Sequence, residues 1–129
     1  MYKTLVGFVT CLIAALVFCG CGQNKASPKV DALELERAFA LKPGAIPGDE
    51  PSPAALAAKA VTAIRAQDWP KAVPILTQLR KTKGLTAQQL EAVHNANGNA
   101  HVRLVEMDKK GNPDAKATLE MLNNAASAR

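Results

Sequence analysis

The chain has 129 residues, of which 48% are hydrophobic and only 4% aromatic, and its formal net charge is +5. This length allows at most one domain, and the scattered basic and scarce aromatic residues exclude nucleic-acid binding, which needs a basic stripe with aromatic stacking residues. Beyond residue 21 the hydrophobic residues are mostly Ala, Leu and Val, which favours helices over strands, so we expect an all-α fold.

The N-terminal residues have the pattern of an export signal. An uncharged, hydrophobic run at residues 4–18 follows the basic Lys3. This run is shorter than the roughly 20 residues that a membrane span needs, and it suits the hydrophobic region of a cleavable signal peptide. We therefore assign residues 1–20 to a signal peptide. The alternative is an uncleaved segment that itself serves as the membrane anchor.

The end of this run, Phe18-Cys19-Gly20-Cys21, resembles the lipobox of bacterial lipoproteins. In that family a small residue precedes the Cys that receives the lipid, and Gly20 fits, although Phe18 stands where the family usually has Leu. The resemblance implies acyl chains, such as palmitate, on Cys21, and more than one chain gives stable anchoring. Gly22, where Asp commonly retains such proteins at the inner membrane, implies the outer membrane, facing the periplasm, in a cell that has one.

Cleavage before Cys21 removes the other two cysteines from the mature protein. No intrachain disulfide can then form, although the compartment is oxidising. The stability of the mature protein must therefore come from packing alone.

Residues 21–52 are expected to form the anchored tether. It contains a short helix at 31–41, for which Asp31 is a suitable N-cap, and a linker at 42–53 rich in Pro and Gly. A helix of this length is marginal alone in water, so it must dock or fray. Its hydrophobic side comprises Ala32, Leu35 and Phe39.

A helical domain is expected over residues 53–127. Its first helix begins after Ser52, a favourable N-cap before a proline, and ends near Gln67. The second begins directly afterwards, at Asp68-Trp69-Pro70, and ends at Gly84. Within it, Pro74 should kink the helix or delay its start, because proline removes a backbone hydrogen bond.

Two further helices complete the predicted domain. Thr86 to Gln89 fits a capping box and begins a long third helix, which ends near Lys109. The fourth begins at Asn112, an N-cap before a proline, and ends near Ala126.

The third helix contains an unusual segment, His94-Asn-Ala-Asn-Gly-Asn-Ala-His101. Asn and Gly are poor helix formers, and Gly98 costs about 1 kcal/mol relative to Ala. The interpretation that we favour is close packing of another helix against the small residues around Gly98. The alternatives are a helix break at Asn97-Gly98 and a polar groove that binds the backbone of a partner.

Two segments of the helical domain repeat one pattern. Residues 69–79 and 112–122 share Pro, Ala, Leu and Leu at equivalent positions. The turn before Ala72 resembles that of a tetratricopeptide repeat, in which an aromatic residue, here Trp69, precedes a small Ala packed between two helices. Ala115 is the equivalent Ala of the second copy. We also expect Trp69 to be buried at this turn, because the domain has few other bulky side chains.

The tetratricopeptide resemblance covers roughly residues 53–126. It implies a small array of antiparallel helical hairpins that binds proteins on a helical surface. Two hairpins are fewer than the three that such arrays normally contain, so a compact up-down four-helix bundle is the alternative architecture. The helix at 31–41 can cap either one.

The sequence offers no catalytic or metal-binding constellation. The mature chain has no Cys beyond Cys21, its serines lie in linkers, a cap and the tail, and no Gly-rich phosphate loop precedes a helix. His94 and His101 share a helical face, but they stand about 10 Å apart along its axis, too far to bind one ion. We therefore expect no enzyme activity, cofactor, metal or small-molecule substrate.

Two functions fit these observations. The first is an anchored adaptor that presents a helical surface to other envelope proteins, with Asn95, Asn99 and His101 of the third helix as its candidate binding residues. The second is a passive structural lipoprotein that serves as a spacer or lid and has no specific partner.

Overall fold

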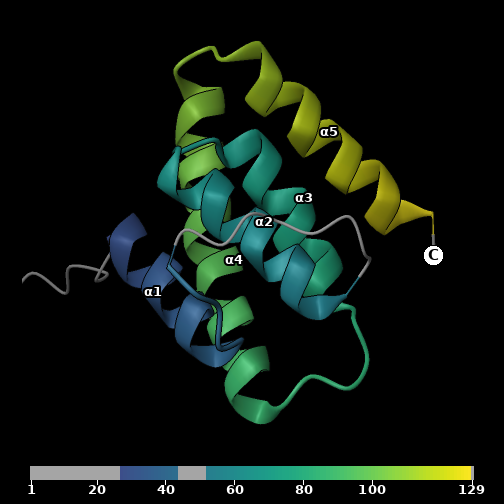
Figure 1. Cartoon of the computed structure of the whole chain (residues 1–129). Coiled ribbons are helices and arrows are strands. Elements are labelled where there is room, and N and C mark those ends of the chain that lie inside the picture. Colours follow the sequence, from purple (N-terminus) through teal and green to yellow (C-terminus); the bar gives the residue numbers. More distant parts are fainter. Residues whose placement is uncertain (1–26, 44–51, 129) are drawn as a thin grey trace, which may run out of the picture.

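The computed structural model describes residues 27–43 and 52–128, and these ranges contain helices and no strand (Figure 1). The expected all-α fold is confirmed. The expected signal peptide, Cys21 and most of the expected linker at 42–53 lie outside the described residues. In chain order the helices are α1 (Pro28–Ala38), α2 (Pro53–Arg65), α3 (Trp69–Arg80), α4 (Ala87–Lys109) and α5 (Pro113–Ser127).

Helices α2 to α5 begin at the N-cap residues that the sequence predicts. The side chains of Ser52, Asp68 and Asn112 each accept a hydrogen bond from a backbone N–H in the first helical turn. The capping box of α4 is also present: Thr86 Oγ1 accepts from the N–H of Gln89 at 3.2 Å, and Gln89 Oε1 accepts from the N–H of Thr86 at 3.0 Å. These contacts satisfy backbone donors that a helix leaves unpaired at its start.

Helix α1 differs from its prediction in its bounds and in its N-cap residue. It begins at Pro28, after Ser27, and ends at Ala38 rather than at residue 41. Asp31 is therefore not the N-cap; it lies inside the first turn with its side chain buried. The hydrophobic side of α1, which includes the fully buried Leu35, packs into the core. The helix therefore docks against α2 and α4, which is one of the two outcomes expected for it.

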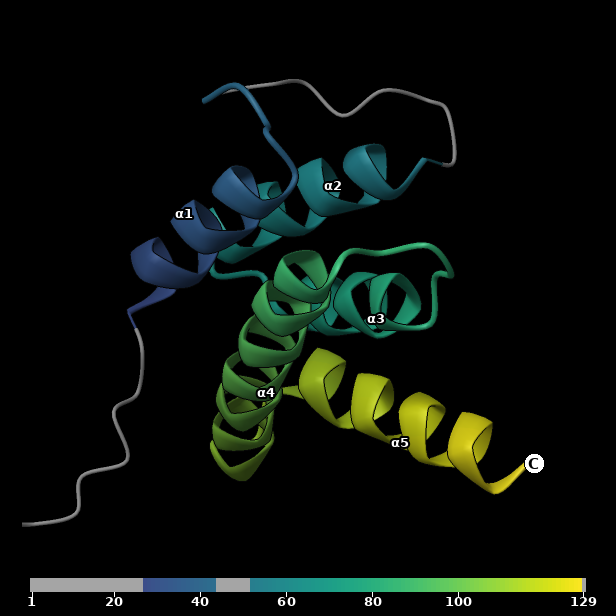
Figure 2. The ribbon, with the colours of Figure 1, turned by 90° about the horizontal axis from the view of Figure 1, so that it is seen from below.

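The helices follow one another across the molecule. Helix α2 packs between α1 and α3, α5 packs beside α3, and the long α4 runs along α1, α3 and α5 (Figure 2). An up-down four-helix bundle would also require extensive contact between its first and last helices. Helices α2 and α5 do not share such contact, and α5 diverges from the other helices towards its C-terminal end (Figure 1).

The core is rich in alanine and contains few bulky side chains. Trp69 is only 6% exposed, which confirms that it is buried at the turn before α3. Ala72 and Ala115, the equivalent alanines of the two repeated segments, are both fully buried. Small side chains at these positions allow α3 and α5 to approach their neighbours closely.

Gly98 and Pro74, two residues that are unfavourable inside helices, do not interrupt α4 and α3. Helix α4 is continuous through Gly98, which is exposed, and a Cβ atom added there would meet no atom within 4 Å. Neither a break nor close packing therefore explains this glycine, although Ala96 and Ala100 on the opposite side do face the core. Pro74 lies inside α3 without delaying its start, which remains at Trp69.

Candidate functional site

The three candidate binding residues on α4 do not share one surface. Asn95 faces a shallow hollow next to α1, which Glu34 and Arg37 also line. His101 lies in a groove towards α3 and α5. At 100° per residue, the six positions from Asn95 to His101 leave the two side chains about 120° apart around the helix axis. The structure therefore does not unite Asn95, Asn99 and His101 into a single groove.

Asn99 is engaged in a contact within the protein. Its Nδ2 donates a hydrogen bond of 2.9 Å to Oδ1 of Asp31, which connects α4 to α1. Burial raises the pKa of the Asp31 carboxyl above its ordinary value, and the hydrogen bond from Asn99 acts in the opposite direction. We conclude that Asn99 helps to hold α1 in place.

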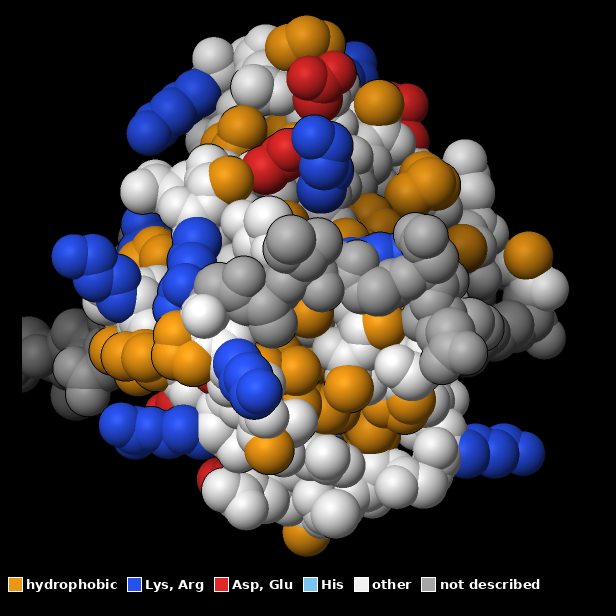
Figure 3. All heavy atoms as spheres, in the orientation of Figure 1, with side chains coloured by type: hydrophobic (Ala, Val, Ile, Leu, Met, Phe, Trp, Pro, Cys, Tyr) orange, Lys and Arg blue, Asp and Glu red, His pale blue; other side chains and the backbone are white. Residues whose placement is uncertain are grey.

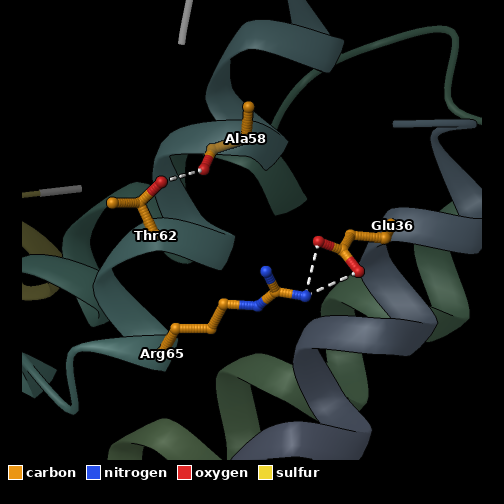
Figure 4. Close-up of polar contacts among 4 residues, drawn as sticks. All are labelled: Glu36, Ala58, Thr62 and Arg65. Carbon is orange, nitrogen blue, oxygen red and sulfur yellow. Dashed lines mark hydrogen bonds and ion pairs between the residues drawn. The ribbon is translucent and has the colours of Figure 1, made fainter. Parts of the chain in front are cut away.

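A second polar contact connects α1 to α2. Arg65 Nη2 lies 2.8 Å from Oε1 and 2.9 Å from Oε2 of Glu36 (Figure 4). The Glu36 side chain is buried, whereas that of Arg65 is 45% exposed. Thr62 Oγ1, drawn in the same figure, donates to the carbonyl of Ala58 within α2 at 3.0 Å. Within the described ranges, every buried polar side-chain atom has a hydrogen-bond partner.

A groove of about 520 Å³ opens between α3, α4 and α5. It forms because α5 diverges from α3 towards its C-terminal end (Figure 2). Its walls combine basic, amide and hydrophobic side chains and contain no Asp or Glu. The residues that line it are Thr77, Arg80, Lys81, Asn97, Gly98, His101, Leu122, Asn123, Ala125 and Ala126.

The charge of this groove is positive. Arg80 and Lys81 lie at the end of α3, where a positive charge complements the helix dipole. Neither forms an ion pair with any residue in the described part of the chain. Thr77 donates a hydrogen bond of 3.4 Å to Oδ1 of Asn97, which links α3 to α4 within the groove. The groove therefore offers two unpaired cations beside hydrophobic surface.

The repeated segments differ in how fully they are covered. In α3, Leu76 and Leu79 are fully buried. Their equivalents in α5, Leu119 and Leu122, are only partly buried, and the neighbouring Met121 is 52% exposed. No other described helix packs on the outer side of α5. Sequence reasoning missed this site because the two segments look alike, and only the packing distinguishes them.

A second hollow, of about 500 Å³, lies at the start of α1. Pro28, Lys29, Leu33, Arg65 and Gln67 contribute to its lining. Figure 3 shows the general character of one face of the molecule, where hydrophobic side chains reach the surface between scattered Lys and Arg side chains.

The residues that the structure describes offer neither a metal-binding cluster nor a membrane-spanning helix. They contain no group of three or more His, Cys, Asp or Glu side chains that could hold a metal ion. His94 and His101 are both exposed on α4. Among the same residues, no helix combines the length and hydrophobicity that crossing a bilayer requires.

No family model, curated protein or solved structure matches this chain. The resemblance of residues 18–21 to a lipobox, and of the turn before Ala72 to a tetratricopeptide repeat, rests on those residues alone. The function must therefore be inferred from the chemistry of the surfaces described above.

Proposed function

We propose that this protein is an exported lipoprotein, anchored in a membrane through Cys21, and that it binds another envelope protein in the groove between α3, α4 and α5. The lipobox-like residues before Cys21 support the anchor. The observation that carries the binding role is a groove with two unpaired cations and no acidic residue, next to the partly covered leucines of α5.

The chemistry of the groove specifies the kind of partner. Arg80 and Lys81 complement acidic side chains, because opposite charges steer and orient two binding surfaces. Leu122 offers hydrophobic surface that a partner can remove from water, at about 25 cal/mol per Å². The expected partner segment therefore carries acidic and hydrophobic side chains together.

This proposal changes the roles of the three candidate residues. His101 remains a candidate contact residue, since it lines the groove and is exposed. Asn95 faces the hollow next to α1, and Asn99 is bound to Asp31. The polar groove expected along α4 is thus replaced by one that α4 shares with α3 and α5.

A charge-reversal experiment with a matched control tests the proposal. The double variant Arg80→Glu/Lys81→Glu reverses two charges at the end of α3, whereas Lys109→Glu/Lys110→Glu does the same at the end of α4, outside the groove. Each variant places two negative charges at the C-terminal end of a helix, so the unfavourable interaction with the helix dipole is similar in both. Capture of partners from detergent-solubilised envelope, with chemical crosslinking, measures binding.

Only the Arg80/Lys81 variant should lose a specific partner, by about tenfold or more, because like charges then face each other across the interface. Equal losses in the two variants would place binding outside the groove. If the wild-type protein captures no specific partner, the passive structural role is the better description.

A further inference from the structure

We propose that the N-terminal part of α1 is the surface on which the protein rests against the bilayer, with Val30 and Leu33 entering the lipid headgroup layer. This inference rests on the proposed lipid anchor at Cys21. It assigns a specific orientation to the anchored domain, which the anchor alone does not determine.

The first observation is a pair of exposed hydrophobic side chains on α1. Val30 is 44% and Leu33 45% exposed, and both belong to the small set of large hydrophobic side chains exposed among the described residues. They are three residues apart on α1 and so lie on one face of the helix. Leu33 also lines the hollow at the start of α1, together with Lys29 and Arg65. Hydrophobic side chains flanked by cations are typical of helices that lie at a membrane interface.

The second observation is the length of chain between the anchor and this surface. Ser27, the residue just before α1, is only six positions after Cys21. Whatever its conformation, this segment spans at most about 20 Å. A lipid on Cys21 therefore keeps the start of α1 near the bilayer at a high effective concentration, so that even a weak surface attraction suffices for contact.

The third observation is the charge of α1. Asp31 is buried against Asn99, and Glu36 is paired with Arg65. Of the carboxylates of α1, only Glu34 is exposed, while Lys29 and Arg37 are exposed cations. The exposed side chains of α1 as a whole therefore carry a net positive charge, although Arg37 lies in its last turn, and this charge complements anionic lipid headgroups.

Site-specific labels can test the orientation in the full-length, lipidated protein. After cleavage Cys21 is the only native cysteine, and its sulfur is occupied by lipid, so an introduced cysteine is labelled uniquely. Leu33→Cys places a fluorophore on the proposed surface. Met121→Cys is the control, since Met121 is similarly exposed, at 52%, but lies on α5. Both proteins are reconstituted into vesicles of phosphatidylethanolamine and phosphatidylglycerol.

Quenchers carried on the lipids should quench the Leu33→Cys label several-fold more strongly than the Met121→Cys label. A quencher dissolved in water should show the opposite order. Adding Lys29→Glu should reduce the lipid quenching at position 33, whereas Lys116→Glu on α5 should not. An acidic residue at the start of α1 favours the helix, so this loss would not reflect unfolding.

The remaining outcomes separate the possible failures. Equal lipid quenching at the two positions, in protein that sediments with the vesicles, would overturn the orientation and leave the anchor intact. A Leu33→Cys label that neither quencher reaches would assign the surface to a second copy or to another protein, and would also overturn the inference. If the protein lacks acyl chains by intact mass and does not sediment with vesicles, the anchor and the orientation fail together.

Discussion

At the scale of single residues, the buried carboxylate of Asp31 is electrostatically unfavourable in the folded protein. Its side chain is buried in the first turn of α1 and accepts a hydrogen bond from Asn99. Burial raises the pKa of this carboxyl in the folded protein, because the charged form is poorly solvated there. The folded state therefore binds a proton more tightly than the unfolded state does. The stability from this group is fully present below the ordinary pKa of an aspartate and is lost as the pH rises through the raised value.

We therefore predict that Asp31→Asn is at least as stable as the wild type at pH 7. The Asn side chain keeps an oxygen that can accept from Asn99, and it removes the buried charge. As the pH falls through the raised pKa of Asp31, the wild type should gain stability relative to the variant. Urea denaturation at a series of pH values measures this difference. A variant that is less stable at pH 7, and equally so in acid, would contradict the role assigned to burial.

Gly98 provides a second prediction at this scale. It is exposed in the middle of α4, and a Cβ atom there would meet nothing within 4 Å. Gly98→Ala should therefore stabilise the protein by about 1 kcal/mol, the difference in helix propensity between the two residues. Gly111→Ala is the control: Gly111 has a φ of 84°, which strains any residue with a Cβ. Stability measured in urea should rise in the first variant and fall in the second.

At the scale of elements, the sequence predicts the beginnings of α2 to α5 but not that of α1. The later helices carry local cap signals, such as Ser52 before a proline, whose effect does not depend on the rest of the fold. Ser27-Pro28 has the same form and could have placed α1 correctly. Besides its hydrophobic side, α1 is held by hydrogen bonds that Asn99 donates to Asp31 and Arg65 donates to Glu36, and these join segments far apart in the chain. No local pattern reveals such pairs.

The Glu36–Arg65 contact leads to a prediction about α1 as a unit. Arg65→Ala leaves the buried Glu36 carboxylate without its partner and should cost roughly 1–2 kcal/mol, less than a fully buried pair because Arg65 is partly exposed. The backbone amides of α1 should then exchange with solvent faster than those of α3 and α4. Lys71→Ala, which breaks the exposed pair with Asp68, should change little. Uniformly faster exchange in all helices would instead indicate global destabilisation.

At the scale of the whole molecule, the groove between α3, α4 and α5 could not be predicted from the sequence. That Asn95 and His101 face different sides of α4 could have been predicted. Residues 69–79 and 112–122 share one pattern, yet Leu79 is fully buried and Leu122 only partly so. That difference arises from the neighbours of each helix and from the divergence of α5 (Figure 1). By contrast, the periodicity of an α-helix already separates Asn95 from His101. The sequence therefore predicted that α4 contributes to the candidate site, but not which face of α4 does so.

The last prediction concerns how the whole molecule is held at a membrane. The lipobox-like motif contains two cysteines, and only Cys21 follows a small residue. Cys21→Ser should therefore remove the protein from the membrane fraction, whereas Cys19→Ser, two residues away in the proposed signal peptide, should leave it there. Intact mass of the mature wild type should begin at Cys21 and include acyl chains, since one chain alone binds membranes only weakly. A Cys21→Ser protein that still carries the same lipids would refute the anchor. Loss of membrane association in Cys19→Ser alone would move the anchor to Cys19 and lengthen the segment before α1.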